Sequence, residues 1–323
     1  MSKGRIIVGL SIFLVLILTI FVYLVTKNEK AQEIIRGYIP DSKINGKQMY
    51  SQTKINSYEP EPEWWPADKF ETSNQPEISG HSGLLVDLNT SHVLFEKNSN
   101  EKMKIASLAK IMTAVVALEH KKLDSKMYVS KKVAGIGENS MQIDEGEIYT
   151  LEELLYGLIL HSGNDSAYAI AEGAAGNSDR FVEWMNFKAK EIGLANTHFT
   201  DPSGLDDSAY STATDLVKLT RYALKDPEFR NIVKTVEKEL TSDTHKYIYL
   251  YNQTNLLTTY PGVAGVKTGY TEEAGLCLVT YTNNEGKEVV GVVLNSIDRK
   301  GDMILMLDHG YKTIGVNVKH NLL

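Results

Sequence analysis

The sequence predicts an α/β fold of the α+β type, in which one antiparallel sheet is flanked by helices and carries a helical insertion. Two observations support the sheet and its helices. Strand-like segments lie at both ends of the region that begins near Gly80, and amphipathic helical segments lie between them. A third observation, one long apolar run near the N-terminus, predicts that a single transmembrane helix precedes this region.

Composition limits the classes of protein to consider. The chain has 323 residues, of which 42% are hydrophobic, so it is long enough for one larger domain with attachments. Its net charge of -7 provides no basic field, and we expect no nucleic acid partner. The single cysteine, Cys277, excludes an intrachain disulfide and is expected to pack in a strand.

The apolar run covers residues 6–25 and contains no charge. At about 1.5 Å per residue it spans roughly 30 Å, which is the thickness of a bilayer core. No small-x-small cleavage site follows it, which favours an uncleaved signal-anchor within residues 1–26 over a cleaved signal peptide. We therefore expect a single-pass protein of the cell membrane with its folded domain on the extracytoplasmic side; secretion after cleavage is the alternative.

Composition also suggests where the folded domain begins. Residues 27–76 are polar and contain prolines at positions 60, 62 and 66, which is typical of a linker or stem. The folded domain is expected over residues 77–316, followed by a short tail over 317–323.

Within the domain, each element has its own signal. The first strands form a hairpin over residues 83–97, because two apolar runs flank the turn-like LNTSH. A capping box of Thr150 and Glu153 opens a helix, and apolar faces predict two more over 178–193 and 212–225. After Pro227 the pattern returns to strands, and a last helix is expected over 303–314.

Three short motifs that carry reactive or polar side chains follow one another along the chain. They are SLAK with Ser107 and Lys110, SGN with Ser162 and Asn164, and KTG with Lys267, Thr268 and Gly269. Each motif alone occurs by chance in many sequences, whereas all three in this order are a specific signal.

The first motif predicts an activated serine. Residues i and i+3 share a helix face, so the Lys110 amine can reach the Ser107 hydroxyl. A serine needs a base to become a nucleophile, and lysine is a base only if its pKa falls far below about 10.4. Burial among apolar neighbours lowers that pKa, and we expect Lys267 to lower it further as a second cation.

The other two motifs predict the rest of a catalytic cleft. Gly163 permits a sharp turn between two helices, from which Ser162 can relay a proton to a leaving amine. From the same turn Asn164 can hydrogen-bond both Lys110 and a substrate amide. Alternatively, Ser162 and Asn164 simply cap a helix.

The segment GVAGVKTGYT is predicted to be an edge strand that pairs with an extended peptide. Gly269 leaves room for a substrate backbone, and Lys267 with Thr268 binds a carboxylate. The backbone N–H groups of Tyr270 and Ser107 are expected to form an oxyanion hole.

Taken together, the motifs and the segments THFTDPSGL, STATDL and GVKTGYTEEAGLCLV resemble the D-alanyl-D-alanine carboxypeptidases, a family of low-molecular-mass penicillin-binding proteins. The resemblance implies a β-lactamase/DD-peptidase-like fold without a cofactor. It also implies that the stem peptide of peptidoglycan acylates Ser107, that terminal D-alanine leaves, and that water hydrolyses the acyl-enzyme. Penicillins and other β-lactams are expected to acylate the same serine.

Several alternatives remain open. They are a DD-endopeptidase that cuts cross-links, a β-lactamase, and an inactive membrane-tethered binding protein. The motifs do not separate the two peptidases, and Arg299 is a further candidate ligand for a substrate carboxylate. His161 adjoins Ser162 but is expected to be structural, and no H-E-x-x-H or similar spacing predicts a metal site. The oligomeric state stays undetermined.

Overall fold

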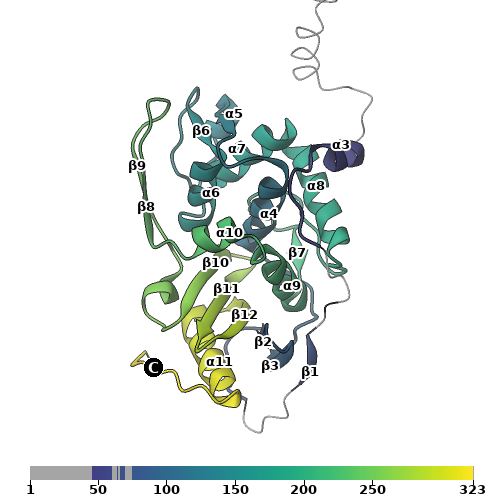
Figure 1. Ribbon diagram of the computed structural model, residues 1–323, viewed down its shortest axis with the longest axis vertical. Coiled ribbons are helices and arrows are strands. Elements are labelled where there is room, and N and C mark those ends of the chain that lie inside the picture. Colours follow the sequence, from purple (N-terminus) through teal and green to yellow (C-terminus); the bar gives the residue numbers. More distant parts are fainter. Residues whose placement is uncertain (1–45, 60–63, 65, 70–74, 323) are drawn as a thin grey trace, which may run out of the picture. The chain divides into compact units, whose positions relative to one another are not determined.

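The computed structural model describes residues 46–59, 64, 66–69 and 75–322 (Figure 1). The chain divides into two compact units, Met1–Met49 and Tyr50–Leu323, and the second contains every predicted site residue. No helix among the described residues is long and apolar enough to cross a bilayer. The predicted transmembrane segment lies outside the described residues.

The second unit is built on a six-stranded sheet with the order β1-β3-β2-β12-β11-β10. Neighbouring strands are antiparallel, as predicted, except that β1 pairs with β3 in parallel. The strands of this sheet are β1 (Ala67–Lys69), β2 (Ser82–Asp87), β3 (His92–Lys97), β10 (Val263–Thr271), β11 (Gly275–Asn284) and β12 (Lys287–Ser296). Three two-stranded sheets pair β4 (Met103–Lys104) with β7 (Tyr210–Ser211), β5 (Lys126–Tyr128) with β6 (Ile148–Thr150), and β8 (Glu237–Leu240) with β9 (Ile248–Tyr251).

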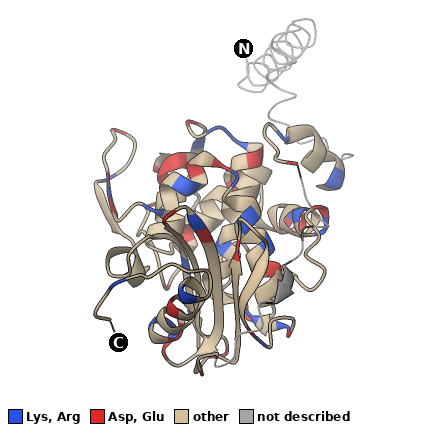
Figure 2. Ribbon diagram, turned by 60° about the horizontal axis from the view of Figure 1, so that its bottom comes forward, with Lys and Arg blue, Asp and Glu red and all other residues tan. Residues whose placement is uncertain are grey.

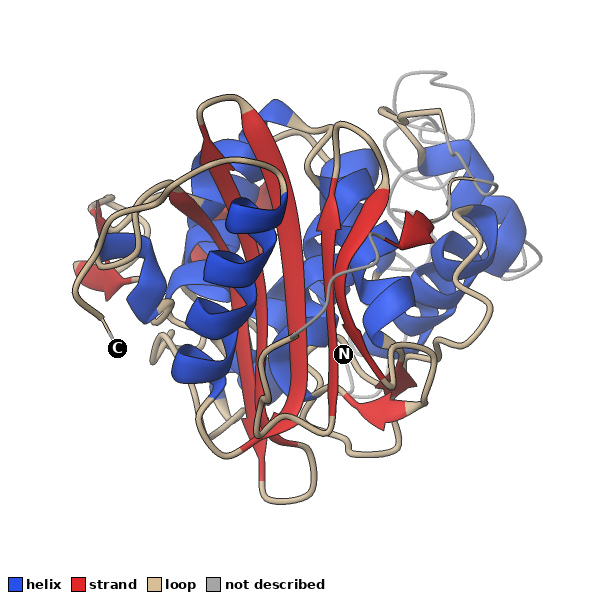
Figure 3. Ribbon diagram, turned by 90° about the horizontal axis from the view of Figure 1, so that it is seen from below, coloured by secondary structure: helices blue, strands red, loops and turns tan. Residues whose placement is uncertain are grey.

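Helices lie on both faces of the sheet, as Figure 3 shows. The α-helices are α3 (Gly46–Thr53), α4 (Lys110–His120), α5 (Lys131–Ala134), α6 (Leu151–Leu160), α7 (Asn164–Ala175), α8 (Ser178–Glu191), α9 (Ala213–Ala223), α10 (Pro227–Val233) and α11 (Arg299–Thr313). The described residues also form two 3-10 helices, η1 (Ala106–Ala109) and η2 (Asn255–Thr258). Helix α11 packs on one face of β11 and β12, while α9 packs on β2 and β12 from the other face.

Local sequence signals explain where several elements begin and what they bury. Both hydrogen bonds of the predicted capping box of Thr150 and Glu153 are present at the start of α6. The predicted apolar face of α8 is buried at Phe181 and Met185. Cys277 is fully buried in β11, which confirms its expected packing role.

Part of the predicted linker belongs to the folded unit. Residues 50–59, which we call the strap, lie against helices α4, α8 and α9. Tyr50 is only 7% exposed, and its ring contacts His120 and Trp184 at centroid distances of 4.8 and 6.1 Å. The Tyr50 hydroxyl donates a hydrogen bond of 2.6 Å to Glu191. The strap is thus anchored by an aromatic side chain as well as by polar contacts.

A buried charge network lies under the strap. The backbone N–H groups of Ile55 and Asn56 donate to the Glu119 carbonyl at 2.7 and 3.1 Å. The Glu119 carboxylate lies 2.6 Å from the fully buried Lys188 amine and 3.5 Å from that of Lys54. A buried charge is costly unless it is paired, so each charge in this cluster is stable in the interior only while its partners are present.

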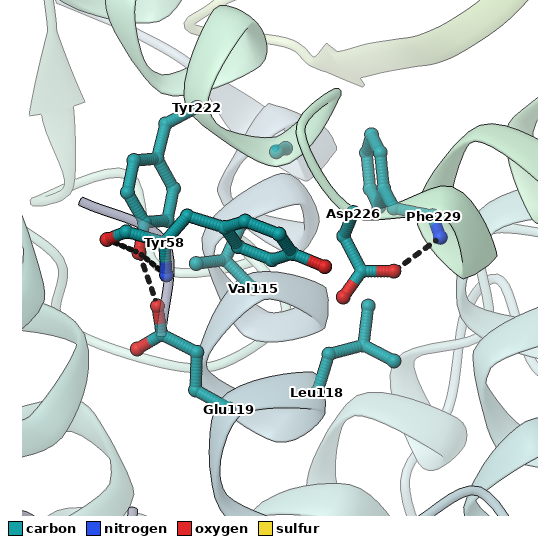
Figure 4. A pocket seen from close by; sticks show the side chains of 8 residues that line it. Tyr58, Val115, Leu118, Glu119, Tyr222, Asp226 and Phe229 are labelled. Carbon is teal, nitrogen blue, oxygen red and sulfur yellow. Dashed lines mark hydrogen bonds between the residues drawn. The ribbon is translucent and has the colours of Figure 1, made fainter. Parts of the chain in front are cut away.

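The end of the strap covers a small pocket, shown in Figure 4. Tyr58 lies there beside Tyr222 and Asp226, over Val115 of α4. The Tyr222 hydroxyl bonds to the Glu119 carboxylate, and burial together with this bond raises the pKa of Tyr222. The pocket lies near the C-terminal end of α4, away from the predicted site at its N-terminal end.

Candidate active site

The predicted nucleophile lies on η1, immediately before α4. Ser107 is partly exposed, whereas its neighbours Ala106 and Leu108 are buried. Ala106 has a left-handed backbone with φ of 47°, and Gly204 packs directly against it. Gly204 itself has φ of 75°, and a Cβ on it would lie 1.9 Å from the Ala106 carbonyl oxygen. Only glycine fits at position 204, so its backbone can pack directly against the backbone of η1 and support it.

The amine of Lys110 is completely buried and lies beside Ser107. It donates hydrogen bonds to the Ser107 hydroxyl at 2.9 Å, to the Asn164 side-chain oxygen at 2.8 Å and to the Ser203 carbonyl at 2.8 Å. Ser107 and Lys110, which are three residues apart in the sequence, are therefore in direct contact, as predicted. The contact between Lys110 and Asn164 joins the first motif to the second.

Burial controls the pKa of both site lysines. Desolvation lowers the pKa of Lys110 from 10.5 to about 7, while the carboxylates of Asp201 and Asp165 oppose this change. Desolvation also lowers the pKa of Lys267 well below its usual value, and the charges of Lys110 and Arg299 lower it further. We expected Lys267 to depress the pKa of Lys110. Burial is the largest cause of the lowered pKa of Lys110, and the repulsion between the two lysines lowers the pKa of Lys267 instead.

The second and third motifs meet at Ser162. Its hydroxyl is buried and accepts a hydrogen bond of 2.9 Å from Lys267, which also donates to the Thr268 carbonyl. The sharp turn between α6 and α7 is made by Ser162 itself, with φ of 61°, and not by Gly163, with φ of -57°. Gly163 is needed for space instead, because a Cβ there would lie 2.7 Å from the Ser166 hydroxyl.

The KTG segment forms β10, an edge strand of the main sheet, as predicted. Gly269 lies against η1, where a Cβ would be 3.0 Å from the Ile105 carbonyl and 3.3 Å from the Ser107 nitrogen. This glycine makes room for the protein's own backbone at η1, and its expected role of leaving room for a substrate stays a prediction. The side chain of Tyr270 is 59% exposed, so its backbone can serve the site without the ring.

Thr268 is buried on β10 next to Lys267. Arg299, which the sequence offered as a carboxylate ligand, donates to the Gly269 carbonyl at 2.8 Å and to the Cys277 carbonyl at 3.4 Å. It therefore braces β10 against β11 in this structure.

A loop between α8 and α9 completes the surroundings of Lys110, and sequence reasoning did not assign it a role. Asp201 accepts hydrogen bonds from the backbone N–H groups of Ser203, Gly204 and Asp206. These bonds fix the carbonyl of Ser203 on Lys110. An Asp-Pro-Ser-Gly run is a turn signal, and this is the feature of the sequence that could have indicated the loop.

His161 lies at the edge of the site. Its ring meets Tyr251 edge-on at a centroid distance of 5.9 Å, whereas the neighbouring Ser162 hydroxyl faces Lys267. It has no contact with the nucleophile that would favour a serine–histidine pair.

Fold and site together define a class of protein. A serine at a helix N-terminus, a buried lysine of low pKa beside it, and an edge strand next to both are the parts of a serine acyl-transfer enzyme that uses lysine as its base. Comparison with known proteins specifies the family. The chain belongs to the D-alanyl-D-alanine carboxypeptidase family, peptidase family S11, which matches residues 69–298.

Three relatives illustrate the similarity. The D-alanyl-D-alanine carboxypeptidase DacF of Bacillus subtilis is 36% identical over 239 residues, which are 71% of this chain and 61% of that protein. The D-alanyl-D-alanine endopeptidase of Escherichia coli is 34% identical, over 71% of this chain and 75% of that protein. The crystal structure of the Streptomyces K15 DD-transpeptidase matches 74% of this chain and all of its own with a TM-score of 0.70 and 32% identity.

Proposed function

We propose that this protein is a serine D-Ala-D-Ala carboxypeptidase that removes the terminal D-alanine from peptidoglycan stem pentapeptides through an acyl-enzyme on Ser107. The observation that carries the proposal is the Lys110 amine, buried, 2.9 Å from the Ser107 hydroxyl and with a pKa of about 7. Near neutral pH about half of such amines are neutral and able to accept the serine proton.

We assign one group to each step of acylation. Lys110 takes the proton as the Ser107 oxygen attacks the carbonyl carbon of the penultimate D-alanine. The backbone N–H groups of Ser107 and Tyr270 stabilise the oxyanion, because Gly269 brings β10 against η1. Ser162 relays the proton that Lys110 took from Ser107 to the nitrogen of the leaving D-alanine as the C–N bond breaks. Lys110, neutral again, then takes a proton from the water that attacks the ester and returns it to the Ser107 oxygen as the peptide leaves.

The terminal carboxylate binds at Lys267 and Thr268 of β10. A carboxylate beside Lys267 favours the charged form of its amine and raises the pKa that burial lowers. Asn164 holds the peptide amide while it remains bound to Lys110.

Two measurements test the proposal. Mass analysis of the penicillin adduct should place it on the tryptic peptide containing Ser107, and D-alanine should be released from a free pentapeptide. A Ser107→Ala variant should show neither. Sustained hydrolysis of a chromogenic cephalosporin, in place of one stoichiometric burst, would favour a β-lactamase instead.

A DD-endopeptidase is the second candidate, since one relative at 34% identity bears that name. The two activities differ in whether a free terminal carboxylate is required. We expect the purified protein to release D-alanine from pentapeptide far faster than it cuts a cross-linked dimer. Equal rates on the two substrates would show that the protein is a DD-endopeptidase and not a carboxypeptidase.

We also propose that residues 1–26 anchor the protein in the cell membrane with the catalytic unit outside the cytoplasm. The uncharged run over residues 6–25 and the extracellular location of peptidoglycan support this arrangement. Full-length protein should stay with membranes after an alkaline wash and be digested by protease added to intact protoplasts. Recovery in the culture medium with a shortened N-terminus would favour secretion after cleavage.

A further inference from the structure

The hairpin of β8 and β9 presents a row of exposed aromatic side chains. It stands at the left edge of the second unit in Figure 1, beside β6 and α6. Tyr247, Tyr249 and Tyr251 are 59%, 47% and 54% exposed, while Ile248 and Leu250 between them are buried. Tyr249 and Tyr251 belong to β9, and Tyr247 immediately precedes it and continues the alternation of exposed and buried residues. Because alternate residues of an extended chain share one face, the three rings form a row with a spacing of about 7 Å. Large apolar surfaces that face solvent in this way commonly bind something.

The hairpin is fixed at both ends. Near its tip, the Ile148 N–H donates to the Thr244 carbonyl at 3.1 Å, and the His245 ring stacks on Tyr149 at a centroid distance of 4.1 Å. At its base, Gln253 donates from its backbone to the Leu160 carbonyl at 3.1 Å. A fixed row of rings loses little conformational entropy when a ligand binds.

The row reaches the candidate active site. Tyr251, at its inner end, meets the ring of His161, and His161 immediately precedes Ser162. A chain that left the cleft over the His161 ring would meet Tyr251 first, and then Tyr249 and Tyr247.

The charges on this face select the kind of ligand. Glu237 and Glu239 lie opposite Tyr251 and Tyr249 in the strand register, and both residues are exposed. One oxygen of the Glu237 carboxylate accepts a hydrogen bond of 2.5 Å from the Tyr249 hydroxyl, which holds that ring on this face. Carboxylates accept hydrogen bonds from hydroxyl groups and repel anions, whereas tyrosine rings offer flat apolar surfaces.

The nearby lysines do not reverse this character. Lys238 lies over the Tyr156 ring at 4.6 Å, and Lys246 pairs with Asp144 at 2.6 Å. Together, flat rings and acceptor carboxylates suit the C–H faces and hydroxyl groups of sugar rings, and they do not suit an anionic phospholipid surface.

We propose that the face formed by Tyr247, Tyr249 and Tyr251 is a subsite for the glycan strand to which the stem peptide is attached. This inference rests on the proposed function, because it is the peptide in the cleft that brings its sugars to the hairpin. The protein would then recognise the polymer and not only the end of the peptide.

The test compares two substrates that differ only in sugar: a free pentapeptide and the same pentapeptide attached to its disaccharide. The full chain in detergent is compared with Tyr247→Ala/Tyr249→Ala and with the matched control Tyr247→Phe/Tyr249→Phe. Removal of two rings should lower kcat/KM on the disaccharide-pentapeptide about tenfold, and by less than twofold on the free pentapeptide. The Phe variant should stay within threefold of the unmodified protein on both substrates, because it keeps the rings. Thermal unfolding and the rate of penicillin acylation verify that both variants fold.

Equal effects of the alanine variant on the two substrates, or no effect on either, would overturn the glycan subsite. Binding of peptide-free glycan strands, measured by co-sedimentation, gives an independent reading. Binding that is lost in the alanine variant and kept in the phenylalanine variant supports the proposal even if the protein releases no D-alanine. If the alanine variant instead loses affinity for acidic phospholipid vesicles, with glycan binding unchanged, the row is a membrane contact and the proposal is wrong. Failure of the proposed function would give a different result from failure of the glycan subsite, because the unmodified protein would then release no D-alanine from the free pentapeptide.

Discussion

Replacement of Lys110 by arginine tests the assigned base most directly. The guanidinium keeps the positive charge but does not lose its proton near neutral pH. Burial brings the pKa of Lys110 to about 7, so about half of the amines are neutral at pH 7, against roughly one in three thousand at an ordinary pKa of 10.5. The acylation rate of Lys110→Arg should therefore fall by about a thousandfold, the size of a typical general-base effect.

The lowered pKa of Lys110 also sets the sign of the pH dependence. Below pH 7 Lys110 is charged and unable to accept a proton, so the acylation rate should fall about tenfold for each pH unit; above pH 7 it should level off. The assay is the second-order rate of labelling by a fluorescent penicillin. Lys110→Met, which keeps a stem of similar length without a base, is the control for packing and should also lose labelling. Labelling of either variant within tenfold of the unmodified protein, or a pH limb near 10, would refute the role.

Three further changes, one of them with a matched control, probe other parts of the fold and the site. Gly204→Ala should destabilise the fold by more than about 3 kcal/mol in denaturant titrations, because its Cβ would collide with the Ala106 carbonyl. Gly286→Ala, with a similar positive φ and open space around it, should cost only about 1 kcal/mol. Tyr50→Ala should lower the free energy of unfolding by about 3 kcal/mol if the strap is part of the fold, and a loss below 1 kcal/mol would contradict that. Thr268→Val should raise KM for pentapeptide about tenfold, and an unchanged KM would remove Thr268 from the carboxylate site.

Local patterns predicted the parts of the molecule that depend on near neighbours in sequence. The spacing of Ser107 and Lys110 suffices to place them together, since three residues are nearly one helical turn. The capping box of Thr150 and Glu153 is likewise complete within four residues. The strands around the KTG motif followed from alternation and turn residues. The family resemblance supplied the convergence of the three motifs, which no local pattern contains.

What the sequence did not reveal depends on long-range packing. The reason for Gly269 lies more than 160 residues away, at the backbone of Ile105 and Ser107. The left-handed turn falls on Ser162 although the adjacent glycine would adopt it more readily, and Gly163 instead lies where a Cβ would be 2.7 Å from the Ser166 hydroxyl. The strap resembled a linker by composition, and only the positions of Glu119 and the surrounding helices show what its polar residues bind.

The three hydrogen bonds of Lys110 also show where its proton comes from. A charged amine has three donors, and the structure supplies three acceptors, at Ser107, Asn164 and Ser203. A neutral amine has two donors and one lone pair, so one of the three contacts must reverse. The carbonyl oxygens of Asn164 and Ser203 have no hydrogen to give, whereas the Ser107 hydroxyl does. The geometry therefore directs the lone pair of the neutral Lys110 to the Ser107 hydroxyl. Of its three partners, only Ser107 can give this amine a proton, so the two carbonyls restrict Lys110 to proton transfer with the nucleophile.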